Sequence, residues 1–184
     1  MSCNNKKIKI TDIAFIGVFA AIMAICSWIS VPFVVPFTLQ TFGVFLTIGV
    51  LGGKRGTMSI LVYLLLGALG VPVFSGFSGG IGYMLGSTGG YIIGFLFSAL
   101  VMWLIECFAP KTKLILIIQM LAGLLVCYAF GTAWFMIVYT KNIGAIGLWT
   151  ALIKCVIPYI IPDLIKIAVA SLICKRIAKA CKLD

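Results

Sequence analysis

The chain has 184 residues, of which 63% are hydrophobic and only 10% are charged, and its net charge is +10. Soluble domains are roughly 45–50% apolar with about a quarter of their residues charged, so this composition excludes a water-soluble globular protein, a disordered chain and a coiled coil. The absence of His removes His-based proton relays, the Ser-His-Asp triad and His-ligated metals. No phosphate-binding loop of the form G-x-x-x-x-G-K-[ST] occurs, so another chain would have to hydrolyse any ATP that drives this one.

Six apolar segments predict an all-α integral membrane protein that forms a single membrane domain over residues 1–184. The predicted spans are about 12–30, 40–52, 57–70, 88–108, 114–139 and 160–176. A crossing helix needs about 20 apolar residues, so the second and third segments are short. Short or irregular segments at membrane depth must be buried in protein or line a cavity. This pair of short spans therefore indicates a ligand pocket.

Three connecting segments are irregular. Pro32 and Pro36 prevent regular helix over 31–39, and the Gly-rich stretch 71–90 carries enough aromatic and aliphatic residues to predict a folded, pocket-lining loop. A short amphipathic helix is predicted over 145–157. Pro158 and Pro162 follow it, and Pro162 is expected in the first turn of the last span.

The basic residues lie at the ends of apolar runs, which indicates a membrane protein in contact with lipid and not a nucleic-acid-binding protein. With an intracellular N-terminus, only Lys141 and Lys154 lie outside and Lys166 lies within a span. The eleven basic residues then on the inside are Lys6, Lys7, Lys9, Lys54, Arg55, Lys111, Lys113, Lys175, Arg176, Lys179 and Lys182. This asymmetry predicts a multi-pass protein of the cell membrane with both termini cytoplasmic and the irregular loops on the outer face.

Asp163 and Lys166 are the strongest candidates for a binding site. They are spaced i, i+3, so they share one face of the last helix, and ionisable residues within a span indicate function by default. They would suit a small ligand with polar and anionic ends. The alternative is a mutual ion pair, with Asp163 in the first helical turn where a negative charge is favoured.

Two further groups have a structural and a functional interpretation. Thr38, Gln40 and Thr41 follow the prolines and would either cap the second span or form hydrogen bonds in an outer pocket. Small residues in the first span let helices approach closely, either within the chain or at a docking surface for a partner membrane protein. The residues assigned to this surface are Gly17, Ala20, Ala21 and Ala24.

Four motifs resemble those of a known family. They are PFTLQTF at 36–42, GGIGY at 79–83, GSTGGYIIGF at 86–95 and PYIIPDLIK at 158–166. Over nearly its whole length the chain resembles BioY, the biotin-binding S components of energy-coupling factor (ECF) vitamin transporters. Ser87 stands where that family usually has Pro, and no Gly separates Pro162 from Asp163, so local loop geometry is expected to differ.

The resemblance implies six helices with biotin bound near the outer face as a transported ligand, no cofactor and no enzymatic activity. It also implies a transmembrane coupling protein and two cytoplasmic ATPases as partners, with the small-residue face of the first span docked to the coupling protein. The residues expected to bind biotin are Thr38, Gln40, Gly80, Gly82, Tyr83, Gly90, Tyr91, Asp163 and Lys166.

Three other functions stay open at this point. The fold could serve as an S component for another small vitamin, because fold alone does not fix the substrate. A stand-alone ion-coupled carrier would have only Asp163 and Glu106 to carry a proton. An intramembrane enzyme is disfavoured by the absence of His and the scarcity of acidic residues.

Overall fold

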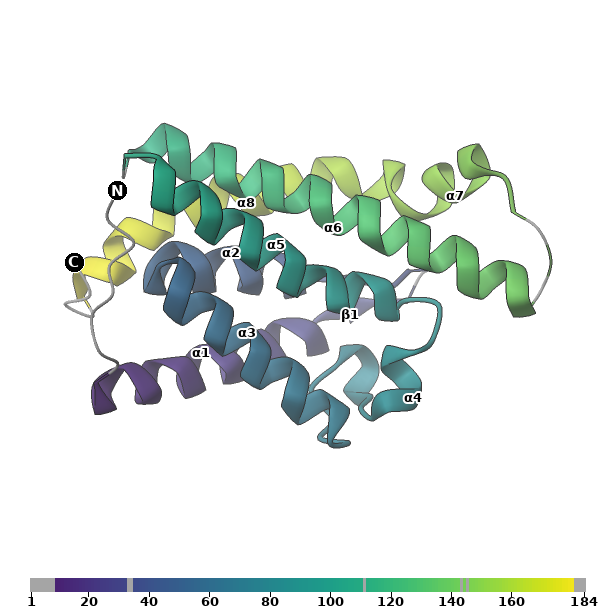
Figure 1. The fold of residues 1–184 in the computed structure, drawn as a ribbon, viewed down its shortest axis with the longest axis horizontal. Helices are drawn as coiled ribbons and strands as arrows, with labels where there is room; N and C mark the ends of the chain where they lie inside the picture. The colour runs from purple at the N-terminus through teal and green to yellow at the C-terminus, as the bar shows by residue number, and fades with distance from the viewer. Residues whose placement is uncertain (1–8, 33–34, 111, 143, 145, 181–184) are drawn as a thin grey trace.

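The computed structural model describes residues 9–32, 35–110, 112–142, 144 and 146–180 (Figure 1). Within these ranges the chain forms eight α-helices, one short 3₁₀ helix and one small antiparallel hairpin. Strand β1 (Ser30–Val31) pairs with β2 (Phe37–Thr38), with Ser30 opposite Thr38. The helices are α1 (Ile10–Trp28), α2 (Gln40–Leu51), α3 (Gly53–Ala68), η1 (Ser75–Phe77), α4 (Ile81–Met84), α5 (Gly89–Phe108), α6 (Lys113–Asn142), α7 (Leu148–Cys155) and α8 (Ile157–Ala180).

Four of the helices, α1, α5, α6 and α8, are long and apolar enough to cross a membrane. The protein is therefore a multi-pass membrane protein, and its long helices expose large apolar side chains such as Leu104, Leu125 and Ile161. Helices α2 and α3 are shorter, with 12 and 16 residues. The prediction that these two segments are short is confirmed, and nine of the twelve α2 residues are buried.

Helix α2 forms the centre of the bundle. It packs against α1, α3, α5 and α8, and its side chains Val44, Phe45 and Ile48 are almost fully buried. Figure 1 shows α2 lying inside the longer helices. The start of α1, the end of α8 and the α2–α3 and α5–α6 turns all lie at one end of the bundle, with α7 at the other (Figure 1).

The last helix differs from its prediction. It begins at Ile157, so Pro158 occupies the first turn and Pro162 lies inside the helix. Proline suits a first turn because its missing N–H would have no partner there, and Pro158 fills that role in place of Pro162. Asp163 consequently lies in the second turn, and its assignment to the first turn is wrong. The amphipathic helix predicted over 145–157 is present as α7.

The Gly-rich segment 71–90 is folded, as predicted. Phe74 is fully buried, with its ring edge-on to Tyr63 and stacked on Tyr83 at centroid distances of 5.6 and 5.7 Å. The carbonyl of Val73 accepts hydrogen bonds from the Ser27 hydroxyl at 2.5 Å and the Tyr63 hydroxyl at 2.9 Å. The segment is thereby anchored to α1 and α3.

Close packing of α3 on this segment yields a first prediction. A Cβ added at Gly67 would lie 2.0 Å from Phe74 Cζ, and the Phe74 ring is fully buried against Tyr63 and Tyr83. Gly67→Ala should therefore lower the free energy of unfolding by about 1–3 kcal/mol, measured as a lower melting temperature of the purified protein in detergent. Gly17→Ala is the matched control, because nothing lies within 4 Å of its added Cβ. Equal melting temperatures would contradict this account.

Candidate functional site

A cavity of about 70 Å³ lies at the end of the bundle opposite the α2–α3 turn. Its lining residues come from eight elements, which are β2, α2, η1, α4, α5, α6, α7 and α8. The cavity forms where the β2–α2 junction meets the first turns of α5, the middle of α6 and the start of α8. Its polar and aromatic lining includes Thr38, Gln40, Thr41, Tyr83, Tyr91, Phe95, Tyr128, Tyr159, Asp163 and Lys166.

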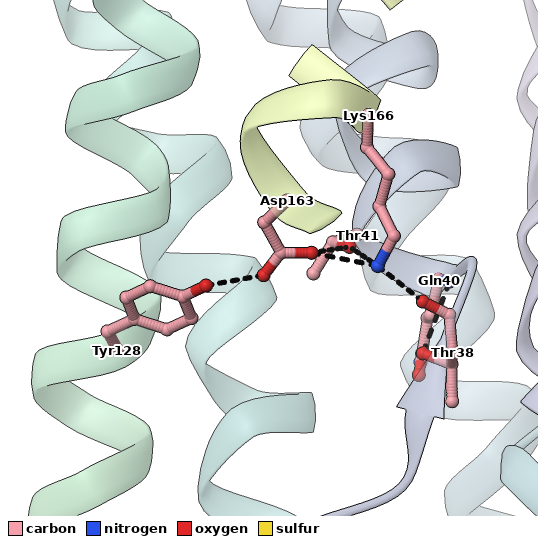
Figure 2. Close-up of polar contacts among 6 residues, drawn as sticks. All are labelled: Thr38, Gln40, Thr41, Tyr128, Asp163 and Lys166. Atoms are coloured by element: carbon pink, nitrogen blue, oxygen red, sulfur yellow. Dashed lines mark hydrogen bonds and ion pairs between the residues drawn. The ribbon is translucent and has the colours of Figure 1, made fainter. Parts of the chain in front are cut away.

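The ammonium group of Lys166 has three hydrogen-bond acceptors around it. Its Nζ donates to Asp163 Oδ1 at 2.8 Å, to the Thr38 carbonyl at 2.6 Å and to Thr41 Oγ1 at 3.0 Å (Figure 2). It also lies 4.4 Å from the centroid of the Phe37 ring, a favourable cation–π distance. A lysine has three N–H donors, so the protein itself uses all three.

The carboxylate of Asp163 connects three helices. Oδ1 accepts hydrogen bonds from Lys166 and from the Thr41 hydroxyl at 3.0 Å, while Oδ2 accepts one from the Tyr128 hydroxyl at 2.5 Å (Figure 2). A carboxylate offers about four acceptor positions, so Oδ2 keeps one for a ligand. Asp163 is only 3% exposed and Lys166 only 7%, and two charges this far from water need each other and their hydrogen bonds.

A second set of hydrogen bonds fixes the cavity wall. Gln40 Nε2 donates to the Tyr63 hydroxyl at 2.6 Å, which ties the start of α2 to α3. The hydroxyls of Tyr91 and Thr132 lie 3.0 Å apart and join α5 to α6. The Tyr159 hydroxyl donates to the Val35 carbonyl and ties α8 to the β1–β2 connection. The aromatic wall is therefore held by polar contacts at its edges.

The structure brings most of the predicted site residues together. Thr38, Gln40, Tyr83, Tyr91, Asp163 and Lys166 all line the cavity. The predicted glycines Gly80, Gly82 and Gly90 are not among the residues that line it, so their part in binding stays a prediction. Gly80 bonds the Gly67 carbonyl through its N–H with a φ of +92°, Gly82 is exposed on α4, and Gly90 allows α5 to approach Trp134 of α6.

Only part of the predicted docking surface is accessible. Ala20 and Ala24 are 3% and 6% exposed and belong to the core, whereas Gly17 and Ala21 are exposed. The two pairs form adjacent stripes of α1, because residues four apart stack on one helix face. Packing of α1 against α2 and α3 covers the Ala20–Ala24 stripe within this chain.

Sequence reasoning missed Tyr128 as a site residue. Helix α6 is apolar on all sides, so no periodic pattern distinguishes the side that faces Asp163. Tyr159 was noted only as part of a motif. The one available signal for Tyr128 is an isolated aromatic hydroxyl within an apolar helix, where a hydroxyl usually finds a hydrogen-bond partner.

The fold and the cavity define a multi-pass membrane protein with a cavity lined by ionic and aromatic side chains near one end of its bundle. The chain belongs to the BioY family, whose model matches residues 4–183. It is similar to the biotin transporter BioY of Thermotoga maritima, with 40% identity over 89% of this chain and 93% of that protein. The probable biotin transporter BioY of Pyrococcus horikoshii is 41% identical over 92% of this chain and 97% of that one.

A solved structure is similar over almost the whole chain. It is a crystal structure of the S-component for biotin from an ECF-type ABC transporter, with a TM-score of 0.81 and 28% sequence identity. The similarity covers 97% of this chain and 95% of that one. These relatives are transporter components, so the family is one of transport proteins and not of enzymes.

The buried ion pair yields a prediction for stability. Asp163→Asn leaves the Lys166 charge without its counter-ion, which should lower the free energy of unfolding by about 3–5 kcal/mol. The double variant Asp163→Asn/Lys166→Met removes both charges and should regain most of that loss. Thermal unfolding of the purified proteins measures both effects, with Lys154→Met on the exposed face of α7 as the control. A double variant no more stable than Asp163→Asn would contradict the coupling.

Proposed function

We propose that this chain is the biotin-binding S component of an ATP-driven ECF vitamin uptake transporter, a binding subunit and not an enzyme. The observation that carries the proposal is the Asp163–Lys166 pair, buried with Tyr128 and Thr41 beside an aromatic wall. The ligand is inferred from the relatives. They are named as a biotin transporter and a probable biotin transporter, and this chain matches them over most of their length.

The chemistry of biotin suits this cavity. Its ureido ring donates N–H bonds, its fused rings are largely apolar and its tail ends in a carboxylate. The free acceptor position on Asp163 Oδ2 suits a ureido N–H, and the Tyr91, Phe95 and Tyr159 rings suit the fused ring system. The three Lys166 donors already have protein acceptors, so we assign Lys166 to positioning Asp163 and not to binding the tail carboxylate.

We extend the proposal to the arrangement in the membrane. Residues 1–184 form one membrane domain in which α1, α2, α3, α5, α6 and α8 are the six transmembrane helices and both termini are cytoplasmic. The short helix α2 is enclosed by its neighbours, and α3 packs on α1, α2 and α5 while exposing the apolar side chains Leu61 and Leu65, which supports their place at membrane depth. The basic residues Lys54, Arg55, Lys113, Lys175, Arg176 and Lys179 lie at the ends of helices that meet at one end of the bundle, which supports a cytoplasmic position for that end.

The partners in this proposal are a transmembrane coupling protein and two cytoplasmic ATPases. The chain has no phosphate-binding loop of its own. On α1, the exposed residues Gly17 and Ala21 form a flat stripe. A Cβ added at Gly17 would have no atom within 4 Å. Such a stripe lets a second membrane helix approach closely, so we place the docking surface there.

Binding titrations test the assignment of the site. The purified chain should bind one biotin per chain and release it chemically unchanged. Asp163→Asn should weaken binding by about 10- to 100-fold, because hydrogen bonds to a charged group contribute roughly 1.5–3 kcal/mol. Lys166→Met should weaken binding of biotin and of an uncharged biotin amide alike, since Lys166 acts through Asp163.

Two outcomes would overturn that assignment. A loss confined to free biotin in Lys166→Met would show that the ammonium binds the ligand carboxylate. Near-wild-type affinity in the double variant Asp163→Asn/Lys166→Met would remove both residues from the site. Recovery of a modified ligand would refute a binding function altogether, and uptake by the chain without ATPase partners would favour an ion-coupled carrier.

Assembly with the coupling protein tests the docking surface. Ala21→Trp should reduce co-purification of the chain with the coupling protein and its ATPases while biotin binding stays intact, because bulk prevents close helix approach. Leu125→Trp is the matched control, since Leu125 is 68% exposed on α6, away from α1. Ala20→Trp and Ala24→Trp should instead fail to fold, because both positions are in the core. Undiminished assembly of Ala21→Trp would place the docking surface elsewhere.

A further inference from the structure

A second and larger cavity lies at the end of the bundle where α8 ends. Its volume is about 600 Å³, and it is bounded by the last turn of α2, the α5–α6 connection, the first turns of α6 and the last turns of α8. No residue of the biotin cavity contributes to it. In the proposed orientation it opens at the cytoplasmic side of the membrane, so it is separate from the substrate site.

The charges in this cavity favour an anion. Lys175 and Lys179 are spaced i, i+4 on α8 and both line the cavity. Within the part of the chain that the structure describes, neither lysine forms a hydrogen bond or ion pair. The cavity also contains Glu106, but its carboxylate accepts the Gly53 N–H at the start of α3. Two lysines therefore face the cavity against one engaged carboxylate.

A buried amide in the cavity wall is a second, independent observation that favours a polar ligand. Gln119 of α6 lines the cavity and is only 5% exposed, yet its Oε1 has no hydrogen-bond partner among the described residues. An unsatisfied buried polar group is costly, and Gln119 is one of the residues that line the cavity. A ligand with a hydroxyl donor would satisfy it.

The surroundings of the cavity are suited to lipid chains. Its wall also includes the apolar residues Ile48, Ile115 and Leu116. Next to it, Ile118 of α6 and Leu172 of α8 are 47% and 61% exposed, and Leu172 lies one turn before Lys175 on the same face. An amphipathic molecule could therefore place a polar head in the cavity and apolar chains along these helices.

We propose that this cavity binds the head group of an anionic phospholipid that also carries hydroxyl donors, the chemistry of phosphatidylglycerol. The phosphate is held by Lys175 and Lys179, and a head-group hydroxyl donates to Gln119. Basic pockets between helices on the cytoplasmic side of a membrane are suited to anionic head groups. The bound lipid joins α6 to α8, the helix that carries Asp163 and Lys166 at its other end.

Lipid titrations of the delipidated full chain, read by native mass spectrometry, test this site. One phosphatidylglycerol should bind per chain, in preference to phosphatidylcholine with the same acyl chains. Lys175→Gln/Lys179→Gln should weaken phosphatidylglycerol binding about thirtyfold, the equivalent of about 1 kcal/mol for each basic residue. The control Lys113→Gln/Arg176→Gln removes two exposed charges at the same end but outside the cavity, and should change binding little.

Further binding measurements identify the ligand. Gln119→Leu should weaken phosphatidylglycerol binding but not binding of phosphatidic acid, which lacks a head-group hydroxyl. Biotin binding, measured on every variant, should be unchanged, so this test is independent of the proposed function.

Four results would overturn the proposal. These are equal binding of phosphatidylglycerol and phosphatidylethanolamine, an equal loss in the lysine and control variants, and displacement of the lipid by soluble glycerol phosphate. The fourth is lost assembly with the coupling protein in Lys175→Gln/Lys179→Gln without lost lipid, which would assign the cavity to a protein partner.

Discussion

Two opposite charges lie 2.8 Å apart at Asp163 and Lys166, and both are almost completely removed from water. Charges in such a place are tolerated only when each has its counter-ion and its remaining hydrogen-bonding capacity is used. That requirement brings four elements together. Thr41 comes from α2, the Thr38 carbonyl from β2, Tyr128 from α6 and the pair itself from α8. The small hairpin and the start of α2 are thereby fixed beside the last helix, which is the arrangement that makes a cavity.

The same pair explains why the site suits a ligand that donates hydrogen bonds. All three Lys166 donors are used within the protein, whereas Asp163 keeps an acceptor position. An ammonium held in this way keeps the carboxylate oriented. The aromatic walls are tied at their edges by the Tyr91–Thr132 and Tyr159–Val35 contacts, so little reorganisation of the walls is needed to receive a ring.

The short central helix has consequences at both of its ends. Twelve residues of helix extend about 18 Å, against about 30 Å of membrane hydrocarbon. The start of α2 at Gln40 borders the smaller cavity, and its end at Leu51 borders the larger one. Longer helices enclose α2 on its sides but leave space beyond its ends. A central helix shorter than the hydrocarbon thickness thus leaves a cavity at each of its ends, one lined by ionic and aromatic side chains and the other by basic and apolar ones.

The membrane architecture and the core of the site follow from the sequence alone. Apolar runs of a given length predict helices because a membrane excludes unpaired backbone groups, and their predicted positions agree with α1, α2, α3, α5, α6 and α8 to within a few residues. Asp163 and Lys166 were identifiable because charges are rare within spans and an i, i+3 spacing places them together. Only together with the other three motifs was the motif around them specific enough to indicate the BioY family.

The tertiary structure decided which side of each helix faces the protein core and which side faces outward. Lipid and protein core are both apolar, so a membrane helix shows no amphipathic pattern to distinguish its two sides, and nothing in the sequence separated Ala20 and Ala24 from Gly17 and Ala21. Tyr128 meets Asp163 only because α6 packs beside α8. Gly80, Gly82 and Gly90 resembled site residues in a motif, yet their places depend on backbone geometry and helix packing. The second cavity joins residues from four helices, and only their packing brings Gln119, Lys175 and Lys179 together.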